Sequence, residues 1–250
     1  RHCMVWHNGP IGLGLTPPHD ISDRIIGEYL PKNEIILDLM KKSYDILKNH
    51  PINIERVKKG LHPGNSIWLW GEGTKPAVSN FFDTYGKKGS VISAVDLIKG
   101  IGISAGMNVV EVEGATGNIN TNFKGKCEAA ANELLSGQDL VYIHVEAPDE
   151  CGHRGEIENK VKSIEFIDNQ ILQPLLNKLE QAGEDYSVLL MPDHPTPICT
   201  KTHSSDPVPF VIYRSNDIKN NEDVLYDEEH AKASGLFISK GCQLMDMLLK

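Results

Sequence analysis

The chain has 250 residues, enough to bury a sizeable core in one large or two modest domains. Its formal net charge of −9 argues against the clustered basic surface that binding to nucleic acid or an anionic membrane requires. Five widely spaced cysteines argue against a disulfide framework and predict a cytoplasmic protein, and no apolar stretch approaches the roughly 20 residues of a membrane span.

The first sixty residues differ in pattern from the rest. A strand-like run at 1–6 leads into a turn and then a loop rich in Gly and Pro. Apolar residues recur at helical spacing from Asn33 to His50, with Asn33 at the N-cap position, and Pro51 ends the helix. A second helix is predicted at 52–59, so we expect residues 1–60 to form a small α+β portion.

From residue 61 onward, strand-like and helix-like segments alternate. This alternation implies βαβ units, and it predicts an α/β fold with a mostly parallel sheet flanked by helices over 61–250. The predicted strands are 66–70, 90–93, 108–112, 139–146, 186–191 and 209–213. The predicted helices follow Lys75 and cover 95–106, 125–135, 158–182 and 240–249.

Candidate metal ligands follow two of these strands. Asp149 and His153 lie in EAPDECGH, which we interpret as a loop, Asp193 and His194 in LLMPDHPTP, and His203 in KTHSSDPVP. Carboxylate oxygens and neutral imidazole nitrogens bind divalent cations such as Mn²⁺ or Zn²⁺. A set split over three segments suits two neighbouring metals better than one structural zinc. The alternative is that each Asp-His step marks a turn and each lone histidine a surface position.

Six segments of the chain are long and distinctive: SIWLWGEG, SVISAVDLIKGIGISAGM, EVEGATGNINTNF, YIHVEAPDECGHRG, MPDHPTP and THSSDPVPF. In this order they resemble the cofactor-independent (2,3-bisphosphoglycerate-independent) phosphoglycerate mutases of the archaeal-type branch, in the alkaline phosphatase superfamily. The resemblance implies an isomerase of glycolysis that interconverts 3- and 2-phosphoglycerate through a phosphoserine. It also implies that 1–60 is part of an inserted substrate-binding domain and 61–250 part of the metal-binding phosphatase-like domain.

By this resemblance, two Mn²⁺ ions lie at the strand ends, with Zn²⁺ or Mg²⁺ as alternatives. Asp149, His153 and His203 would hold one ion, and Asp193 with His194 would supply part of the other site. The resemblance thus agrees with the site expected from ligand chemistry alone.

The substrate is expected to be a small phosphorylated metabolite. In the inserted domain His19 and Asp20, in a loop with two prolines, and Arg1 are candidates for binding it, and Lys75 could reach its phosphate. Each of these charged residues could equally be a solvated surface group.

The chain departs from the family pattern at the nucleophile. The family has a serine on an N-terminal helix and a further metal-binding aspartate, and Ser22 and Ser43 do not have that setting. We therefore expect a C-terminal fragment without a catalytic nucleophile, inactive alone, with an exposed sheet edge open to self-association. Two alternatives stay open: another phosphotransferase or phosphohydrolase of the superfamily, and a non-catalytic metal-binding fragment.

Overall fold

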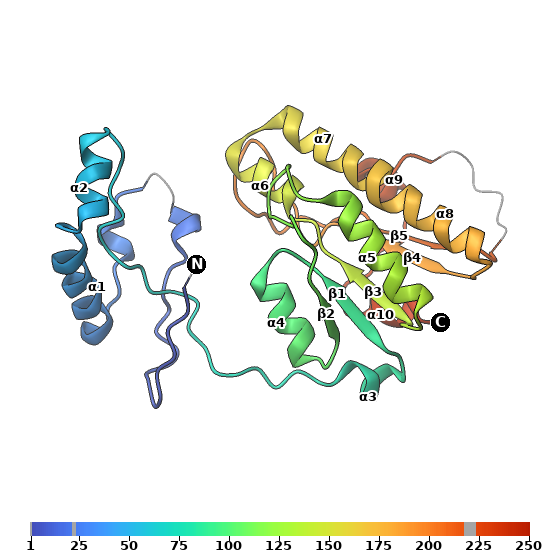
Figure 1. Ribbon diagram of the computed structural model, residues 1–250, viewed down its shortest axis with the longest axis horizontal. Helices are drawn as coiled ribbons and strands as arrows, with labels where there is room; N and C mark the ends of the chain where they lie inside the picture. The colour runs from blue at the N-terminus through green and yellow to red at the C-terminus, as the bar shows by residue number, and fades with distance from the viewer. Residues whose placement is uncertain (1, 22–23, 218–223) are drawn as a thin grey trace. The chain divides into compact units, whose positions relative to one another are not determined.

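The computed structural model describes residues 2–21, 24–217 and 224–250. By its internal contacts the chain divides into two compact units, Arg1–Pro76 and Ala77–Lys250. Figure 1 follows the chain through both units from blue to red, and each unit is described by itself. Among the described residues, no helix has the length and apolar character needed to cross a lipid bilayer.

The first unit is built around two helices. Asn33 begins the first of them as predicted, because its side chain accepts hydrogen bonds from the backbone N–H groups of Ile35 and Ile36. This helix ends at Leu47, earlier than the predicted His50, and Pro51 starts the next one, where its missing N–H has no consequence. The helical segments are η1 (Pro18–Ile21), η2 (Ile26–Tyr29), α1 (Glu34–Leu47) and α2 (Pro51–Lys58).

Two strand predictions for this region are wrong. Residues 2–6 and 66–70 are irregular, and the described residues up to Pro76 contain no strand. In the segment 66–70, two N–H groups donate hydrogen bonds to residues that lie earlier in the first unit. Ile67 N–H donates to Ser43 Oγ at 2.9 Å, and the Trp68 indole N–H donates to the Thr16 carbonyl at 2.8 Å. These bonds attach the segment to the first unit, although its pattern is that of a strand.

The second unit contains the predicted parallel sheet. Strand β1 lies in the middle of the order β2-β1-β3 and pairs in parallel with both neighbours. Each crossover contains a helix, so the unit has the α/β organisation expected from the alternating pattern. The elements are β1 (Gly89–Ile92), α4 (Asp96–Ser104), β2 (Asn108–Val110), α5 (Phe123–Leu135) and β3 (Leu140–Ile143).

Neighbouring residues of β1 serve opposite faces of this sheet. Val91 meets α4 so closely that a Cβ on Gly102 would lie 2.8 Å from its Cγ2. Ile92 points the other way, into the main core, and is 0% exposed. Small side chains on α5 let that helix approach the sheet and α8 (Gln173–Ala182). The core comprises Ile92, Phe123, Cys127, Ala130, Ala131, Ala147, Ile171, Leu175 and Leu179.

The long helix predicted at 158–182 forms with an interruption. It runs as α7 (Ile157–Ile167), a π-helical segment η3 (Asp168–Leu172) and α8, as Figure 1 shows in yellow and orange. Pro174 explains the break, because proline has no N–H to donate and its ring crowds the carbonyl one turn earlier. Two core residues, Ile171 and Leu175, lie on either side of this proline, so the buried stripe continues through it.

The last two strands form a separate antiparallel pair, β4 (Ser187–Leu190) with β5 (Val211–Arg214). Helix α10 (Gln243–Leu248) lies within the helix predicted at the C-terminal end. Three further helices, α3 (Phe81–Tyr85), α6 (Ala147–Arg154) and α9 (Glu228–Ala233), complete the unit. Of these, α6 and α9 are not anticipated by the sequence analysis.

Replacing Ile92 by alanine should lower the free energy of unfolding by about 2–5 kcal/mol, because it leaves a cavity where β1 meets α5. The matched control is Ile103→Ala on α4, where the side chain is 66% exposed and a change within about 0.5 kcal/mol is expected. Urea unfolding followed by circular dichroism measures both. Equal losses in the two variants would contradict this assignment of the core.

One charged residue lies inside the same core. Lys126 on α5 is 0% exposed, and its ammonium donates to the His144 carbonyl at 2.8 Å. Burial lowers the pKa of Lys126 from 10.5 to about 8. Between these values the unfolded chain holds a proton that the folded chain lacks, so stability rises with pH in this window.

The Lys126→Met variant should therefore lack part of the pH dependence of the wild type. Its free energy of unfolding, subtracted from that of the wild type, should give a difference that increases from about pH 8 to pH 10.5, by at most about 1.4 kcal/mol per pH unit. Below pH 8 the difference should be constant, because Lys126 is then protonated in both states. Parallel profiles over the whole range would show that the buried amine keeps its ordinary pKa.

Candidate metal centre

Asp149 and His153 lie on a helix and not on the loop expected from the sequence. Strand β3 ends at Ile143, and α6 begins soon afterwards at Ala147 with Pro148 in its first turn. Proline suits the start of a helix, and Gly155 ends α6 in the left-handed conformation. The two candidate ligands are four residues apart, so the helix places them on one face.

The remaining candidates lie in the long connection between β4 and β5. Asp193 and His194 come shortly after β4 ends at Leu190. The connection then folds back on itself, and Ser204 N–H donates to the Pro195 carbonyl at 3.2 Å. As a result the rings of His194 and His203 lie against each other, with centroids 3.8 Å apart and planes tilted by 35°.

Three side chains from these two segments converge on one point, and we call them the metal trio: Asp149, His153 and His203. Their potential ligand atoms all lie within 4.8 Å of one another. Asp149 Oδ2 is 3.4 Å from His153 Nε2, Asp149 Oδ1 is 3.4 Å from His203 Nε2, and the two Nε2 atoms are 3.1 Å apart.

The trio fits a divalent cation. Ligands at about 2.0–2.2 Å from a metal in tetrahedral or octahedral geometry are separated by roughly 3–3.5 Å. The three observed separations fall in that range, with a different oxygen of Asp149 facing each of the two imidazoles. Asp149 is partly buried and His203 is 43% exposed, so the trio is open to solvent on one side.

Asp193 and His194 lie beside the trio. His194 Nε2 is 3.4 Å from Asp193 Oδ2, and the Asp193 side chain is 56% exposed. Thr196 connects this pair to the trio, because its hydroxyl donates to Asp149 Oδ1 and lies 3.4 Å from His194 Nδ1. One buried threonine thus contacts a candidate ligand from each of the two expected metal sites.

Lys160 holds the two ligand-bearing segments together. Its ammonium donates to the Pro148 carbonyl in α6 and to the Thr196 carbonyl in the β4–β5 connection, both at 3.1 Å. The segments approach so closely that a Cβ on Gly152 would lie 2.5 Å from the Thr196 oxygen. Only glycine fits there without displacing the connection.

Two residues at the end of β3 interact electrostatically with the candidate ligands, His144 and Tyr142. His144, which follows β3, has its pKa lowered by burial, and its Nδ1 lies 3.1 Å from Ser93 Oγ. The pKa of Tyr142 is raised by burial and by the charge of Asp193.

His144, Thr196 and Lys160 were not singled out from the sequence. A threonine between two prolines is typical of a turn, and a lysine on an amphipathic helix is typical of a solvated face.

The candidate substrate-binding residues belong to the first unit or fall outside the described residues. Arg1 is not among the described residues. His19 and Asp20 lie in the short 3₁₀ segment η1, and Lys75 is exposed in irregular chain next to Pro76, the last residue of the first unit. Their role in binding substrate stays a prediction.

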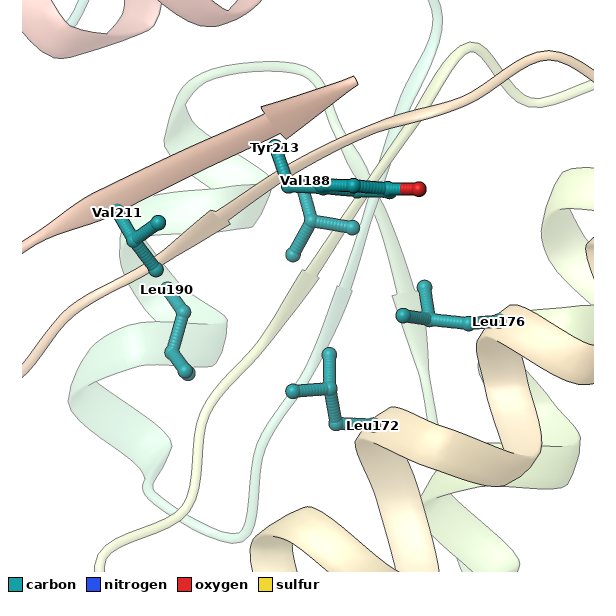
Figure 2. A pocket seen from close by; sticks show the side chains of 6 residues that line it. All are labelled: Leu172, Leu176, Val188, Leu190, Val211 and Tyr213. Carbon is teal, nitrogen blue, oxygen red and sulfur yellow. The ribbon is translucent and has the colours of Figure 1, made fainter. Parts of the chain in front are cut away.

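A pocket in the second unit has a different character. It lies between the β4–β5 pair and the helical residues Leu172 and Leu176, which Figure 2 shows facing the strands. Its volume is about 210 Å³. The lining residues carry no metal-binding or nucleophilic group apart from the phenol of Tyr213. They are Leu172, Leu176, Val188, Leu190, Val211 and Tyr213.

Comparisons with known proteins relate the chain to phosphoglycerate mutases. Residues 1–53 match the 2,3-bisphosphoglycerate-independent phosphoglycerate mutase family. The chain is 48% identical to the probable mutase of that type from Geobacter sulfurreducens, covering 100% of this chain and 63% of the relative. It is 48% identical to the corresponding enzyme of Methanosarcina barkeri, covering 94% of this chain and 60% of the relative. The chain thus spans less than two thirds of the length of these curated relatives.

Solved structures give the same picture. A Pyrococcus horikoshii protein matches with a TM-score of 0.65 at 30% identity, over 80% of this chain and 51% of that one. The cofactor-independent phosphoglycerate mutase of Thermoplasma acidophilum matches with a TM-score of 0.53 at 25% identity, over 86% of this chain and 50% of that one.

Residues 29–250, which include the whole metal trio, match the Metalloenzyme superfamily, and the chain belongs to that superfamily.

Proposed function

We propose that the chain is the metal-binding part of a 2,3-bisphosphoglycerate-independent phosphoglycerate mutase, which interconverts 3- and 2-phosphoglycerate through a phosphoserine. The observation that carries the proposal is the convergence of one carboxylate and two imidazoles from α6 and the β4–β5 connection. The similarity to curated mutases over the whole chain supports the choice of reaction.

In this proposal Asp149, His153 and His203 hold one divalent cation, and Asp193 with His194 supplies part of a second site. Mn²⁺ is the proposed ion, and Zn²⁺ suits the same donor set. Bound cations neutralise the charge on the transferring phosphoryl oxygens. The residues of the chain prepare the site for that step. The carboxylates and imidazoles would hold the cations where the phosphate binds, and Lys160 and Thr196 fix the spacing of these side chains.

The substrate is proposed to be a small phosphorylated metabolite bound with the help of the first unit, where His19, Asp20, Arg1 and Lys75 are the candidates. A cytoplasmic location is proposed because the five cysteines are free, as is typical of a reducing compartment. Self-association through an uncovered strand edge also stays a prediction.

The first test is metal affinity, measured on the chain itself by titration calorimetry with Mn²⁺ and with Zn²⁺. His153→Ala should weaken binding at the trio by more than about 100-fold, a larger loss than outer residues of a metal site cause. The matched control is His230→Ala, because His230 also pairs with an aspartate on the same element, the N-cap residue Asp227 of α9, at 2.7 Å. Equal affinity in the two variants would rule out the trio as a metal site.

The second test concerns the reaction. A hybrid in which this chain replaces the matching part of the Geobacter sulfurreducens relative should convert 3- to 2-phosphoglycerate with Mn²⁺, followed by coupling to enolase. Asp149→Asn in the hybrid should reduce turnover by at least about 100-fold, since a ligand carboxylate is lost. A hybrid that binds Mn²⁺ but only releases phosphate would favour a phosphohydrolase over a mutase.

The 250-residue chain alone should give no measurable mutase turnover with 3-phosphoglycerate and Mn²⁺. Transfer through a phosphoenzyme needs a serine in line with the phosphate. Ser204, which directly follows a trio histidine, instead donates its hydroxyl to Asp206 at 2.7 Å. Turnover abolished by Ser204→Ala or Ser205→Ala would show that the nucleophile lies in this loop.

A further inference from the structure

The backbone of Lys201 has an uncommon conformation next to the metal trio. Its φ angle is +53°, in the left-handed region that a residue with a side chain seldom adopts, at a cost of about 1–2 kcal/mol. We propose that Lys201 is a positioning residue whose left-handed backbone directs its carbonyl oxygen onto His153 and thereby selects the imidazole tautomer that can bind a metal. The inference rests on the proposed metal site and assigns a role to a residue outside the trio.

The hydrogen bond determines where the proton lies on His153. His153 Nδ1 is 2.9 Å from the Lys201 carbonyl oxygen, and a carbonyl can only accept. Nδ1 therefore carries the proton in the neutral ring, and Nε2 keeps its lone pair. That lone pair belongs to the atom that lies 3.1 Å from His203 Nε2 and 3.4 Å from Asp149 Oδ2.

The local turn explains how the carbonyl comes to face the ring. Lys201 N–H donates to the Pro197 carbonyl at 2.9 Å and Thr200 N–H to the same oxygen at 3.2 Å. The turn closes against the end of α6, where Gly155 is also left-handed at φ +71°, and a Cβ on Gly155 would lie 2.9 Å from Lys201 Cε. The lysine stem thus covers the glycine that ends the helix carrying His153.

Backbone and side chain make separable contributions, and two substitutions distinguish them. Lys201→Gly and Lys201→Val both remove the ammonium and the stem. Glycine adopts a positive φ readily, whereas a β-branched residue is strongly disfavoured there. The glycine variant should therefore keep the carbonyl on His153, and the valine variant should turn it away.

The first readout needs neither metal nor activity. Long-range ¹H–¹⁵N NMR of the metal-free chain at pH 8, where imidazoles are generally neutral, reports which ring nitrogen carries the proton. Wild type and Lys201→Gly should show His153 protonated at Nδ1, and Lys201→Val should show a mixture of tautomers. The second readout is Zn²⁺ affinity, which should fall about 10–100-fold in the valine variant and stay within about threefold in the glycine variant.

Two outcomes overturn the proposal. If Lys201→Val keeps the Nδ1 proton and the Zn²⁺ affinity, the backbone conformation has no role in selecting the tautomer. If Lys201→Gly loses as much as Lys201→Val, the side chain is responsible. Should Lys201→Val fail to fold by circular dichroism, Lys201→Ala against Lys201→Asn repeats the comparison with less strain. If neither the wild type nor any variant binds Zn²⁺, the proposed metal site is wrong. The NMR result still decides whether Lys201 selects the tautomer of His153.

Discussion

The close approach of α6 to the β4–β5 connection is the constraint on which the second unit's chemistry depends. All five candidate ligands lie on these two segments, which are far apart in sequence. Lys160 joins the two segments by donating to one carbonyl of each. Gly152 lets them approach because any side chain at this position would collide with the Thr196 carbonyl. A shift of about 1 Å between the segments would misplace the trio, and misplacements of that size can cost about 100-fold in the rate of a reaction.

The lone pairs of the trio also repel one another unless a positive charge lies between them. Two imidazole nitrogens face each other at 3.1 Å, with a carboxylate 3.4 Å from each. If both nitrogens kept their lone pairs, the three donors would repel one another. A proton or a metal between them removes the repulsion, and Thr196 takes up one further lone pair of Asp149. An arrangement with three donors and a surplus of lone pairs is therefore suited to a positive charge at its centre.

Segments with complete local information could be predicted from the sequence. Asn33 was recognised as an N-cap, and the strands near 90–93, 108–112 and 139–146 were found, because capping and apolar runs are local signals. The strand at 66–70 was wrong because a strand needs a partner, which its own sequence cannot supply. Segment 147–154 follows directly on a strand and is therefore expected to be a loop, yet proline in the first turn and glycine at the C-cap favour the helix that forms there.

The candidate site likewise contains residues that the sequence identifies and residues that it does not. Its candidate ligands can be identified from the sequence because aspartate and histidine after a strand are distinctive side chains at distinctive positions. The residues that set its geometry cannot, since Lys160, Thr196 and Lys201 act through carbonyls, a hydroxyl and a backbone angle that many sequences could provide. Comparison among members of the superfamily is therefore most informative at these positions: a relative that keeps the ligands but carries a β-branched residue at the position of Lys201 must orient its histidine by another contact.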